Sequence, residues 1–403
     1  MSITLIKSLF WLGIVTVSYT YLGYGLLLWL LLRFKSKAAK QSDDQTEDFP
    51  EVTFIVCAYN EEDWIAQKIE NSLAVDYPDD KIIFYFVTDG SNDATPNIVE
   101  HFPYPKGVQW KLLHQPERRG KIAAFQRAMA EAGSPIVVST DANTRINSLA
   151  IQNMVRHFKD SNVGAVAGEK RISLGSKNDA SSAGEGIYWQ YESLLKKWDS
   201  ELGSVIGAAG ELFAIRTEAY EDVPTDTLVE DFYLTMRIAQ KGWRVAYEPE
   251  AFAVEGASAS VAEEMKRKVR IAAGGLQATV RLAPLLNIFR YGMLSFQYVS
   301  HRVLRWTLAP LFIPIIFLCN LALVQDGQAL YQFTLAGQII FYSAALLGWF
   351  LEKRKVKIAA FFVPYYFCVM NWAMYAGLWR LMRGKQSVMW EKAKRSQENG
   401  SIG

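Results

Sequence analysis

Long uncharged stretches stand at both ends of the chain, and a charge-rich region, residues 34–290, lies between them. About 20 apolar residues are enough to cross a bilayer as a helix, and each stretch has at least 20 residues. The pattern predicts membrane-spanning helices around one large globular domain, which argues against a fully soluble protein and against a transporter. The four stretches are residues 8–32, 306–325, 327–351 and 358–379.

Basic residues flank these stretches on one side. Arg33 and Lys35 follow the first stretch and Lys353 follows the third, whereas the loop between the second and third holds only Asp326. Because lysine and arginine stay on the cytoplasmic side of a membrane, we expect a multi-pass protein of the cell's inner (plasma) membrane with its N-terminus outside. The same rule places the central domain in the cytoplasm.

The fourth stretch breaks this charge pattern. Basic residues from Arg380 onward follow it, although a simple span would place them outside the cell. Pro364 and Asn371 interrupt it, so a re-entrant or broken helix and an ordinary span are both open. Before the second stretch, residues 282–301 mix apolar residues with Arg290 and predict a helix lying along the cytoplasmic face.

Within the central domain, short apolar runs alternate with helical patterns. Strands that alternate with helices predict a parallel sheet covered by helices on both faces, and ligands of such sheets bind at the carboxyl ends of the strands. The predicted strands are residues 52–58, 82–88, 108–113 and 136–140, and the predicted helices are residues 60–74, 94–102 and 121–132. The expected parts of the chain are a first span (residues 1–33), a polar linker (34–50), the globular domain (51–280), an interfacial helix (281–302), further spans (303–382) and a basic tail (383–403).

The overall charge is nearly balanced, with 43 lysines and arginines against 41 aspartates and glutamates. A protein that binds nucleic acid normally has a strong basic excess, so we expect no nucleic-acid partner. The three cysteines, Cys57, Cys319 and Cys368, have no spacing that suggests zinc or disulfides. We interpret them as small buried apolar residues.

Polar clusters follow three of the predicted strands. They begin at Tyr59, Asp89 and Asp141, and no G-x-G-x-x-G motif follows the first strand. At one edge of the sheet they would form an acidic pocket, whose oxygen ligands suit Mg²⁺ or Mn²⁺ and, through the ion, a diphosphate. Taken singly, each cluster also fits a turn or a helix cap, as Asp93 before the helix at residue 94 illustrates.

These residues, taken in order, resemble the membrane-embedded family 2 glycosyltransferases, which include the cellulose, chitin, hyaluronan and poly-N-acetylglucosamine synthases. The resemblance covers about residues 52–276 and the flanking membrane segments. It implies a GT-A fold, which is a Rossmann-like mixed α/β sheet with helices on both faces. The motifs are A-Y-N-E-E at residues 58–62, D-G-S-x-D at 89–93, G-K-x-x-A at 120–124, D-A-N at 141–143 and E-D-x-x-L-x-x-R-x-x-x-x-G-W at 230–243.

The resemblance implies a donor site for a nucleotide sugar, which we expect to be a UDP-sugar. Lys121 would reach the base or the diphosphate, and Asp141 would bind the Mg²⁺ or Mn²⁺ ion that bridges the diphosphate. Asn143 would be the second metal ligand, with an amide oxygen where the family has a second acid. The remaining donor-binding residues would be Tyr59, Asn60, Glu61, Asp89 and Arg270.

On the acceptor side, the resemblance makes Asp231 the general base that takes the proton from the acceptor hydroxyl, so that in-line attack inverts the anomeric carbon. Glu230 beside it is a second catalytic candidate. The run from Thr227 to Glu230 also has the T-x-x-E form of a helix capping box, so a structural role for Glu230 is equally open. Gly210 offers either close approach for an acceptor or a tight contact within the fold, and Arg267 is the other acceptor-side candidate.

One departure from the family bears on product length. Polymerising members carry Q-x-x-R-W where this chain has Arg267, Arg270 and Ile271. An aliphatic side chain cannot stack on a sugar ring as tryptophan does, which puts processive synthesis in doubt. The same basic stretch also fits a helix face that lies on anionic lipid headgroups.

The sequence thus predicts a membrane glycosyltransferase that synthesises or extends a cell-surface polysaccharide from a cytosolic nucleotide sugar. Its partners would be that donor, a glycan or lipid-linked acceptor, the lipid bilayer and, as a further option, subunits of an export system. Two alternatives stay open: transfer of a single sugar to a lipid-linked acceptor, and a non-catalytic protein that binds nucleotide sugar without turnover. The presence of Asp89, Asp141 and Asp231 together counts against the second alternative, because a binding module needs no general base.

Overall fold

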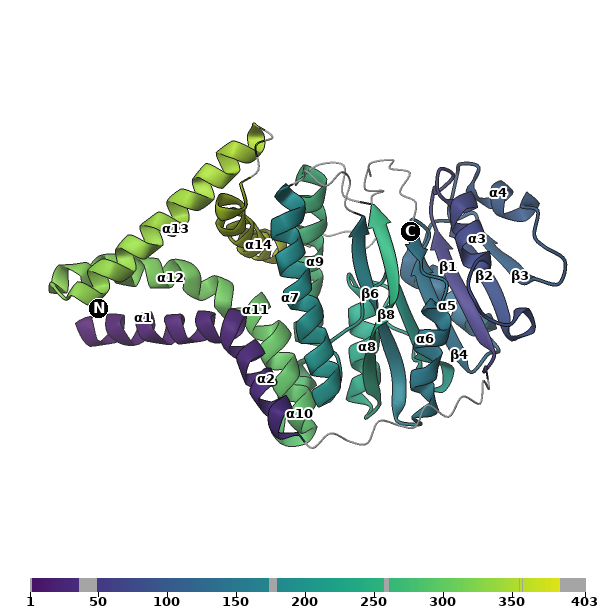
Figure 1. Ribbon diagram of the computed structural model, residues 1–403, viewed down its shortest axis with the longest axis horizontal. Coiled ribbons are helices and arrows are strands. Elements are labelled where there is room, and N and C mark those ends of the chain that lie inside the picture. The colour runs from purple at the N-terminus through teal and green to yellow at the C-terminus, as the bar shows by residue number, and fades with distance from the viewer. Residues whose placement is uncertain are drawn as a thin grey trace. The chain divides into compact units, whose positions relative to one another are not determined.

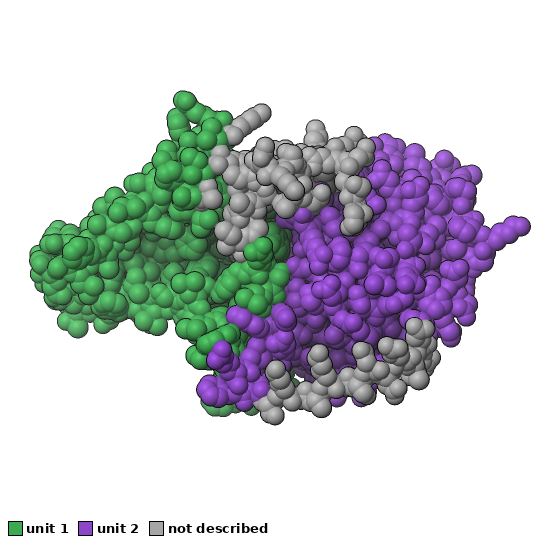
Figure 2. All heavy atoms as spheres, viewed as in Figure 1, with its two compact units in different colours: residues 1–31, 174–195, 264–386 green, residues 32–173, 196–263, 387–403 purple. Residues whose placement is uncertain are grey.

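The computed structural model describes residues 2–35, 49–173, 180–256, 261–354, 356 and 358–384. The chain forms two compact units that interleave along the sequence (Figure 2). Unit 1 contains residues 1–31, 174–195 and 264–386, and unit 2 contains residues 32–173, 196–263 and 387–403. The apolar helices belong to unit 1, and the polar clusters that follow the predicted strands belong to unit 2.

Unit 2 is built on one eight-stranded sheet with the order β3-β2-β1-β4-β7-β6-β8-β5. Strands β3, β2, β1 and β4 are parallel, as the sequence predicts. Strand β7 runs antiparallel to β4 and β6, and β5 runs antiparallel to β8, so the whole sheet is mixed, as the GT-A resemblance implies. The strands are β1 Val52–Ala58, β2 Ile82–Asp89, β3 Gln109–Gln115, β4 Ile136–Asp141, β5 Thr144–Ile146, β6 Val163–Ser173, β7 Leu212–Arg216 and β8 Arg244–Gly256.

Helices cover both faces of this sheet (Figure 1). On one face, Phe54 and Phe86 share a core with Ile65 of α3 and with side chains of α4 and α6. On the other face, the ring of Phe125 from α5 lies 5.9 Å from that of Phe213 in β7. Central strands are buried on both sides, which explains their continuous apolar runs. The helices are α3 Ile65–Leu73, α4 Thr95–His101, α5 Lys121–Glu131, α6 Ala150–Val155 and α8 Glu230–Gln240.

The predicted strands and helices of the first half are confirmed, with one difference at the start of α3. The helix begins at Ile65 and not at the predicted Asn60. Asn60 has a left-handed backbone, with φ of 51°, which a right-handed helix cannot contain. The chain uses this turn to expose the polar residues after β1 before the helix begins.

Unit 1 consists of helices, and three of the described helical segments are long and apolar enough to cross a membrane: Ile3–Phe34, Leu308–Asp326 and Ala329–Lys353. Helix α1 packs on α12 so closely that a Cβ on Gly13 would lie 2.6 Å from Ile316 Cγ1. Small residues are typical of such contacts between apolar helices. The helices of this unit are α1 Ile3–Ser18, α2 Tyr24–Phe34, α9 Val261–Arg281, α10 Ile288–Tyr298, α11 Leu304–Trp306, α12 Leu308–Leu323, α13 Ala329–Lys353 and α14 Ala359–Met382.

The fourth predicted stretch forms α14, which is one continuous helix with Pro364 inside it. The alternative of two half-helices is therefore wrong, although α14 is not among the three span-like segments found in the described chain. Its tyrosine, asparagine and tryptophan residues lower the mean hydropathy of the helix. Helix α14 also supplies a hydrogen bond that α12 lacks. Pro314 of α12 has no N–H to donate to the carbonyl of Pro310, and the Tyr375 hydroxyl of α14 donates to that carbonyl instead.

The stretch predicted to lie along the cytoplasmic face is helical, as expected. It comprises a short turn at Ala283–Leu286 and then α10, which bends at Gly292, where φ is 51°. Its position at a membrane surface stays a prediction.

Unit 1 also holds a buried ion cluster around Glu192 of α7 (Ala180–Leu202). Its carboxylate lies 2.8 Å from Arg302, 2.8 Å from Arg305 and 3.3 Å from His301 Nε2. Although burial opposes the charge, these basic neighbours hold the pKa of Glu192 well below its usual range. The cluster ties α7 to the turns that precede α12.

Candidate active site

The ends of strands β1, β2 and β4 lie level at one edge of the sheet. Ala58 pairs with Thr88, and Cys57 pairs with Asp141. Because these strands are parallel, the polar residues that follow each of them emerge at the same edge. The structure therefore brings together the three clusters that the sequence singled out.

Hydrogen bonds join the loop after β1 to the loop after β2. Asn60 Nδ2 donates to Asn92 Oδ1 (2.7 Å), and the Asn92 N–H donates to Asn60 Oδ1 (2.9 Å). The Glu61 N–H donates to Thr95 Oγ1 (2.8 Å). Asp93 accepts a bond from the N–H of Thr95 (3.0 Å), but Ala94 and not Asp93 occupies the cap position of α4. Asn60 and the backbone of Glu61 thus join the loop after β1 to the segment after β2.

Asp89 is buried at the end of β2 and holds the loop before α5. Its Oδ2 accepts hydrogen bonds from the backbone N–H groups of Arg119 (2.9 Å) and Gly120 (2.6 Å). This contact fixes the residue directly before Lys121, so Asp89 places the lysine even without touching it. In the same loop, the Arg118 guanidinium lies 3.6 Å from the centre of the Tyr59 ring, which joins the loops after β1 and β3 by a cation–π contact.

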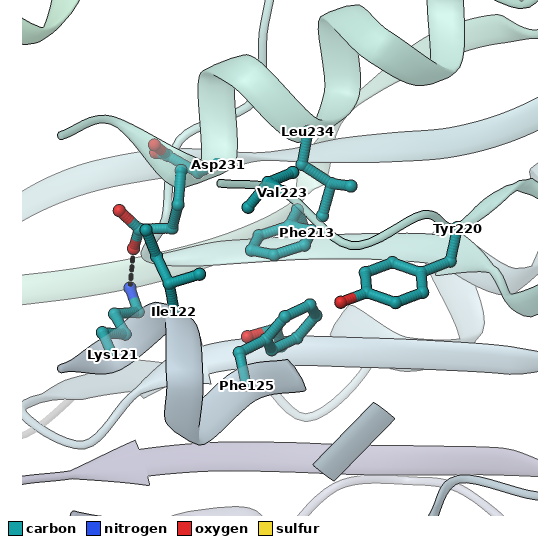
Figure 3. Close-up of a pocket in the computed structure, with 10 residues that line it drawn as sticks. Lys121, Ile122, Phe125, Phe213, Tyr220, Val223, Asp231 and Leu234 are labelled. Carbon is teal, nitrogen blue, oxygen red and sulfur yellow. Dashed lines mark ion pairs between the residues drawn. The ribbon is translucent and has the colours of Figure 1, made fainter. Parts of the chain in front are cut away.

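Lys121 is the centre of the site. Its Nζ lies 2.7 Å from Asp141 Oδ1 and 3.2 Å from Glu230 Oε1, and Figure 3 shows its ion pair with Glu230. Burial opposes the ammonium charge, but the carboxylates of Asp141 and Glu230 nonetheless raise the pKa of Lys121 well above its usual value. The lysine therefore remains charged at any physiological pH.

Asp231 is the second residue of α8 and directly follows Glu230. A Cβ placed on Gly210 would lie 3.2 Å from Asp231 Oδ2 and 3.2 Å from Lys121 Nζ, so all three residues converge. Burial, reinforced by the neighbouring Glu230 carboxylate, raises the pKa of Asp231 to about 7. A carboxyl group with this pKa is suited to take up a proton near neutral pH.

A small pocket extends from these charged residues into an apolar wall (Figure 3). Phe125, Phe213 and Leu234 form this wall next to Asp231. An apolar wall disfavours the ionised carboxylate and so contributes to the raised pKa of Asp231.

The capping box predicted from Thr227 to Glu230 is wrong. Helix α8 begins at Glu230 itself, Val229 occupies the cap position, and no side chain caps the helix. The Thr227 hydroxyl donates instead to the carbonyl of Pro224 (2.6 Å). Because Glu230 is the first helical residue and not the third, its carboxylate is directed to Lys121.

Three charged residues of the site were missed in the sequence. Lys170 of β6 forms ion pairs with Glu211 and with Glu255 of β8. The Glu211 carboxylate also acts on the site, since it raises the pKa of both Asp141 and Asp231. The sequence signal that could have identified them is their position: Lys170 and Glu255 lie near the ends of otherwise apolar strands, and Glu211 directly follows Gly210.

The predicted metal ligands Asp141 and Asn143 flank the turn between β4 and β5. Burial raises the pKa of Asp141, Lys121 opposes this effect, and Glu211 and Glu255 add to it. Carboxylates outnumber lysines here, so the site has the charge and the hard oxygen donors that suit Mg²⁺ or Mn²⁺. Among the described residues, no group of three or more histidine, cysteine, aspartate or glutamate side chains is arranged to hold a metal ion; magnesium sites typically use one or two carboxylates together with substrate phosphates.

Two predicted site residues lie on α9, in unit 1. Arg267 forms an ion pair with Glu264 (2.9 Å), and the buried Lys268 contacts Glu264 (3.0 Å) and the Tyr366 hydroxyl (2.8 Å). The donor role of Arg270 and the acceptor role of Arg267 stay predictions.

Comparison with known proteins identifies the relatives of this chain. Residues 50–274 match the family described as glycosyltransferase like family 2. The poly-beta-1,6-N-acetyl-D-glucosamine synthase of Staphylococcus aureus is 28% identical over 249 residues, which are 60% of this chain and 58% of the relative. The Staphylococcus epidermidis enzyme of the same name is 27% identical over 254 residues, 61% of this chain and 59% of the relative. The chain thus matches less than two thirds of the length of these relatives.

One solved structure matches nearly the whole chain. The mannosyltransferase PcManGT from Pyrobaculum calidifontis, in complex with GDP-Man and Mn²⁺, has a TM-score of 0.71 over 94% of this chain and 99% of that chain, at 23% identity. The likeness confirms the GT-A fold.

Proposed function

Because this chain belongs to the glycosyltransferase like family 2, we propose that it is an inverting enzyme that transfers sugar from a cytosolic nucleotide sugar to a glycan or lipid-linked acceptor. The observation that carries the proposal is the convergence of Asp231, Lys121 and Gly210, where a carboxyl group with a pKa of about 7 lies beside a backbone position that has no side chain. A small residue beside the base leaves room for an acceptor hydroxyl.

In the proposed reaction, Asp231 takes the proton from the acceptor hydroxyl. The hydroxyl oxygen forms a bond to the anomeric carbon while the bond from that carbon to the diphosphate oxygen breaks. The leaving nucleoside diphosphate keeps the electron pair, and the configuration at the anomeric carbon inverts. Lys121 supplies fixed positive charge beside this departing group, which is electrostatic stabilisation of the transition state.

The donor is proposed to be a UDP-sugar, bound at the edge formed by Tyr59, Asn60, Glu61 and Asp89. The solved neighbour contains GDP-Man and Mn²⁺, which supports a nucleotide sugar and a divalent cation for this chain. Asp141 and Asn143 would hold that Mg²⁺ or Mn²⁺ ion, which when bound supplies positive charge to the diphosphate.

The product is proposed to be a cell-surface polysaccharide made at the inner membrane. The relatives named as poly-beta-1,6-N-acetyl-D-glucosamine synthases and the three span-like segments support this view. A single addition to a lipid-linked acceptor is the second candidate. Ile271, an aliphatic residue that is 39% exposed, favours it, since polymerising members have tryptophan at the matching position.

The test uses membranes that contain the full-length protein and a panel of radiolabelled UDP- and GDP-sugars, with and without EDTA. We expect transfer from one donor only, its loss in EDTA, and its loss in Asp141→Ala. A ladder of products would indicate polymerisation, and one discrete product would indicate single addition. Absence of transfer from every donor, with the Asp231→Asn protein giving the same background, would contradict the proposal.

A further inference from the structure

Lys68 of α3 lies in the interior of unit 2 against the turn between β4 and β5. It is only 1% exposed, which is rare for lysine because burial removes water from the ammonium group. The ammonium donates to Thr140 Oγ1 (3.0 Å), to the carbonyl of Thr144 (2.9 Å) and to Thr144 Oγ1 (3.4 Å). All three acceptors are neutral, and burial lowers the pKa of Lys68 to about 7.

The two threonines bracket the turn that carries Asp141 and Asn143. Thr140 directly precedes Asp141, and Thr144 directly follows Asn143. The Thr144 hydroxyl donates its proton to the carbonyl of Asp141 (2.9 Å), which leaves its oxygen to accept the bond from Lys68. Both ends of the turn are therefore held by the side-chain nitrogen of Lys68.

The same network reaches the acceptor side of the site. The Thr140 hydroxyl donates to the carbonyl of Glu211 (2.8 Å), the residue after Gly210. Lys68 thus fixes a hydroxyl that joins the turn carrying Asp141 to the segment that begins β7. Without the ammonium, both threonine oxygens and the Thr144 carbonyl would lose a donor in a buried place, which is costly.

A second side chain of α3 acts on the same segment. Asn71 Oδ1 accepts from the N–H of Ile146 (2.8 Å), and Asn71 Nδ2 donates to its carbonyl (2.9 Å). Lys68 and Asn71 are three residues apart and so share a face of the helix. Helix α3 therefore holds the whole segment from Thr140 to Ile146 by two polar side chains.

We propose that Lys68 is a positioning residue for the divalent-cation site, which sets the geometry of Asp141 and Asn143 without touching the ion or the diphosphate. The inference rests on the proposed function, because it takes these two residues as the metal ligands. An apolar side chain at position 68 would avoid the cost of burying a charge. The buried side-chain nitrogen is therefore explained by the positions that its hydrogen bonds impose.

The test compares Lys68→Met with the wild-type full-length protein in lipid nanodiscs. Mn²⁺ affinity in the presence of UDP or GDP is measured by electron paramagnetic resonance, and kcat and the donor KM are measured separately. Loss of a residue that supports metal ligands typically weakens metal binding about 10–100-fold, and we expect a loss in this range. We expect kcat to recover at saturating Mn²⁺, because the base and Lys121 are intact.

Ile69→Val is the matched control, since Ile69 is the neighbouring buried residue of α3. It should lower the melting temperature while the Mn²⁺ affinity stays unchanged. If Lys68→Met gave only this pattern, Lys68 would be structural and the proposal would be overturned.

A second variant covers the case in which Lys68→Met does not fold. Thr144→Val keeps the shape of the side chain but removes the hydroxyl that links Lys68 to the Asp141 carbonyl. We expect a severalfold loss of Mn²⁺ affinity, and unchanged affinity would overturn the proposal. Wild-type protein that binds nucleotide equally well with and without Mn²⁺ would instead overturn the proposed metal site itself.

Discussion

Each unit of the molecule contains a buried cluster of charged side chains, around Lys121 in unit 2 and around Glu192 in unit 1, and these two clusters are built in opposite ways. In unit 2, the cation Lys121 faces the carboxylates of Asp141 and Glu230. In unit 1, the carboxylate of Glu192 faces the basic side chains of Arg302 and Arg305. Both clusters are ion pairs taken out of water, so distance alone does not distinguish a site from a structural contact.

The pKa shifts distinguish the two clusters. In unit 2, burial and neighbouring carboxylates raise the pKa of Asp141 and Asp231, so the ionised form of both acids is destabilised. In unit 1, the basic neighbours lower the pKa of Glu192, so its charge is fully stabilised. Acids whose pKa is raised by burial and by neighbouring carboxylates are typical of functional sites, whereas acids whose charge is stabilised by basic neighbours are typical of structural ion pairs. The comparison therefore supports the proposed chemistry in unit 2 and a structural role for the Glu192 cluster.

The strongest test of this contrast is Asp231→Asn. We expect transfer to fall about 10²–10⁴-fold, because an amide cannot accept the proton that a general base removes. Donor binding and the melting temperature should stay near wild type, since the amide has the same shape. The measurements are initial rates, nucleotide affinity and thermal unfolding, and wild-type turnover would contradict the role of Asp231.

Glu192→Gln should have the opposite profile. Removing one partner from a buried ion cluster typically costs roughly 3–5 kcal/mol, so we expect a large loss of stability in thermal unfolding of the protein in detergent. The control is Glu221→Gln, which removes a carboxylate between Arg237 and Lys241 at the surface of unit 2 and should cost about 1 kcal/mol or less. An equal loss of stability in both variants would contradict the structural role of the Glu192 cluster.

The pH dependence of transfer sharpens the contrast further. Asp231 must be ionised to act as a base, so kcat/KM should fall as the pH decreases through its pKa of about 7. Because the Glu211 carboxylate raises this pKa, Glu211→Gln should move the acidic limb of the profile to lower pH. Glu218→Gln, an exposed residue paired with Arg216, is the control and should leave the limb in place. A limb that stays in place in both variants would show that another group controls it.

The smallest expected effect is that of Asn143→Asp. The change adds one more carboxylate to the crowded side of unit 2 and restores the second acid of the family motif. We expect transfer to be retained and Mn²⁺ to bind more tightly, because an anionic ligand attracts a divalent cation more than an amide does. Titration of Mn²⁺ against activity measures this, and weaker binding would place Asn143 outside the metal site.

The sequence by itself determined the elements of the first half of the sheet and the residues at its edge. Continuous apolar runs such as residues 52–58 have to be buried on both faces, and the polar residues after them have to lie at the strand ends. Local pattern was enough here because each parallel strand and the helix after it are adjacent in the chain. The motifs at Asp89, Lys121, Asp141 and Asp231 follow from the same argument and from the family resemblance.

Only the tertiary structure decided how these residues are used. No local pattern indicates that Lys68 contacts the turn at Asp141, that Lys170 joins Glu211 to Glu255, or that Glu192 pairs with arginines of unit 1. In each case the partners lie far apart in the sequence, and the contact exists only after these distant segments have packed together. The capping box at Thr227, which the sequence left open, is absent for a related reason: spacing alone does not show that α8 begins at Glu230 or that Glu230 pairs with Lys121. Periodicity is a local property, but the pairing of buried charges depends on which distant segments are brought together when water is excluded.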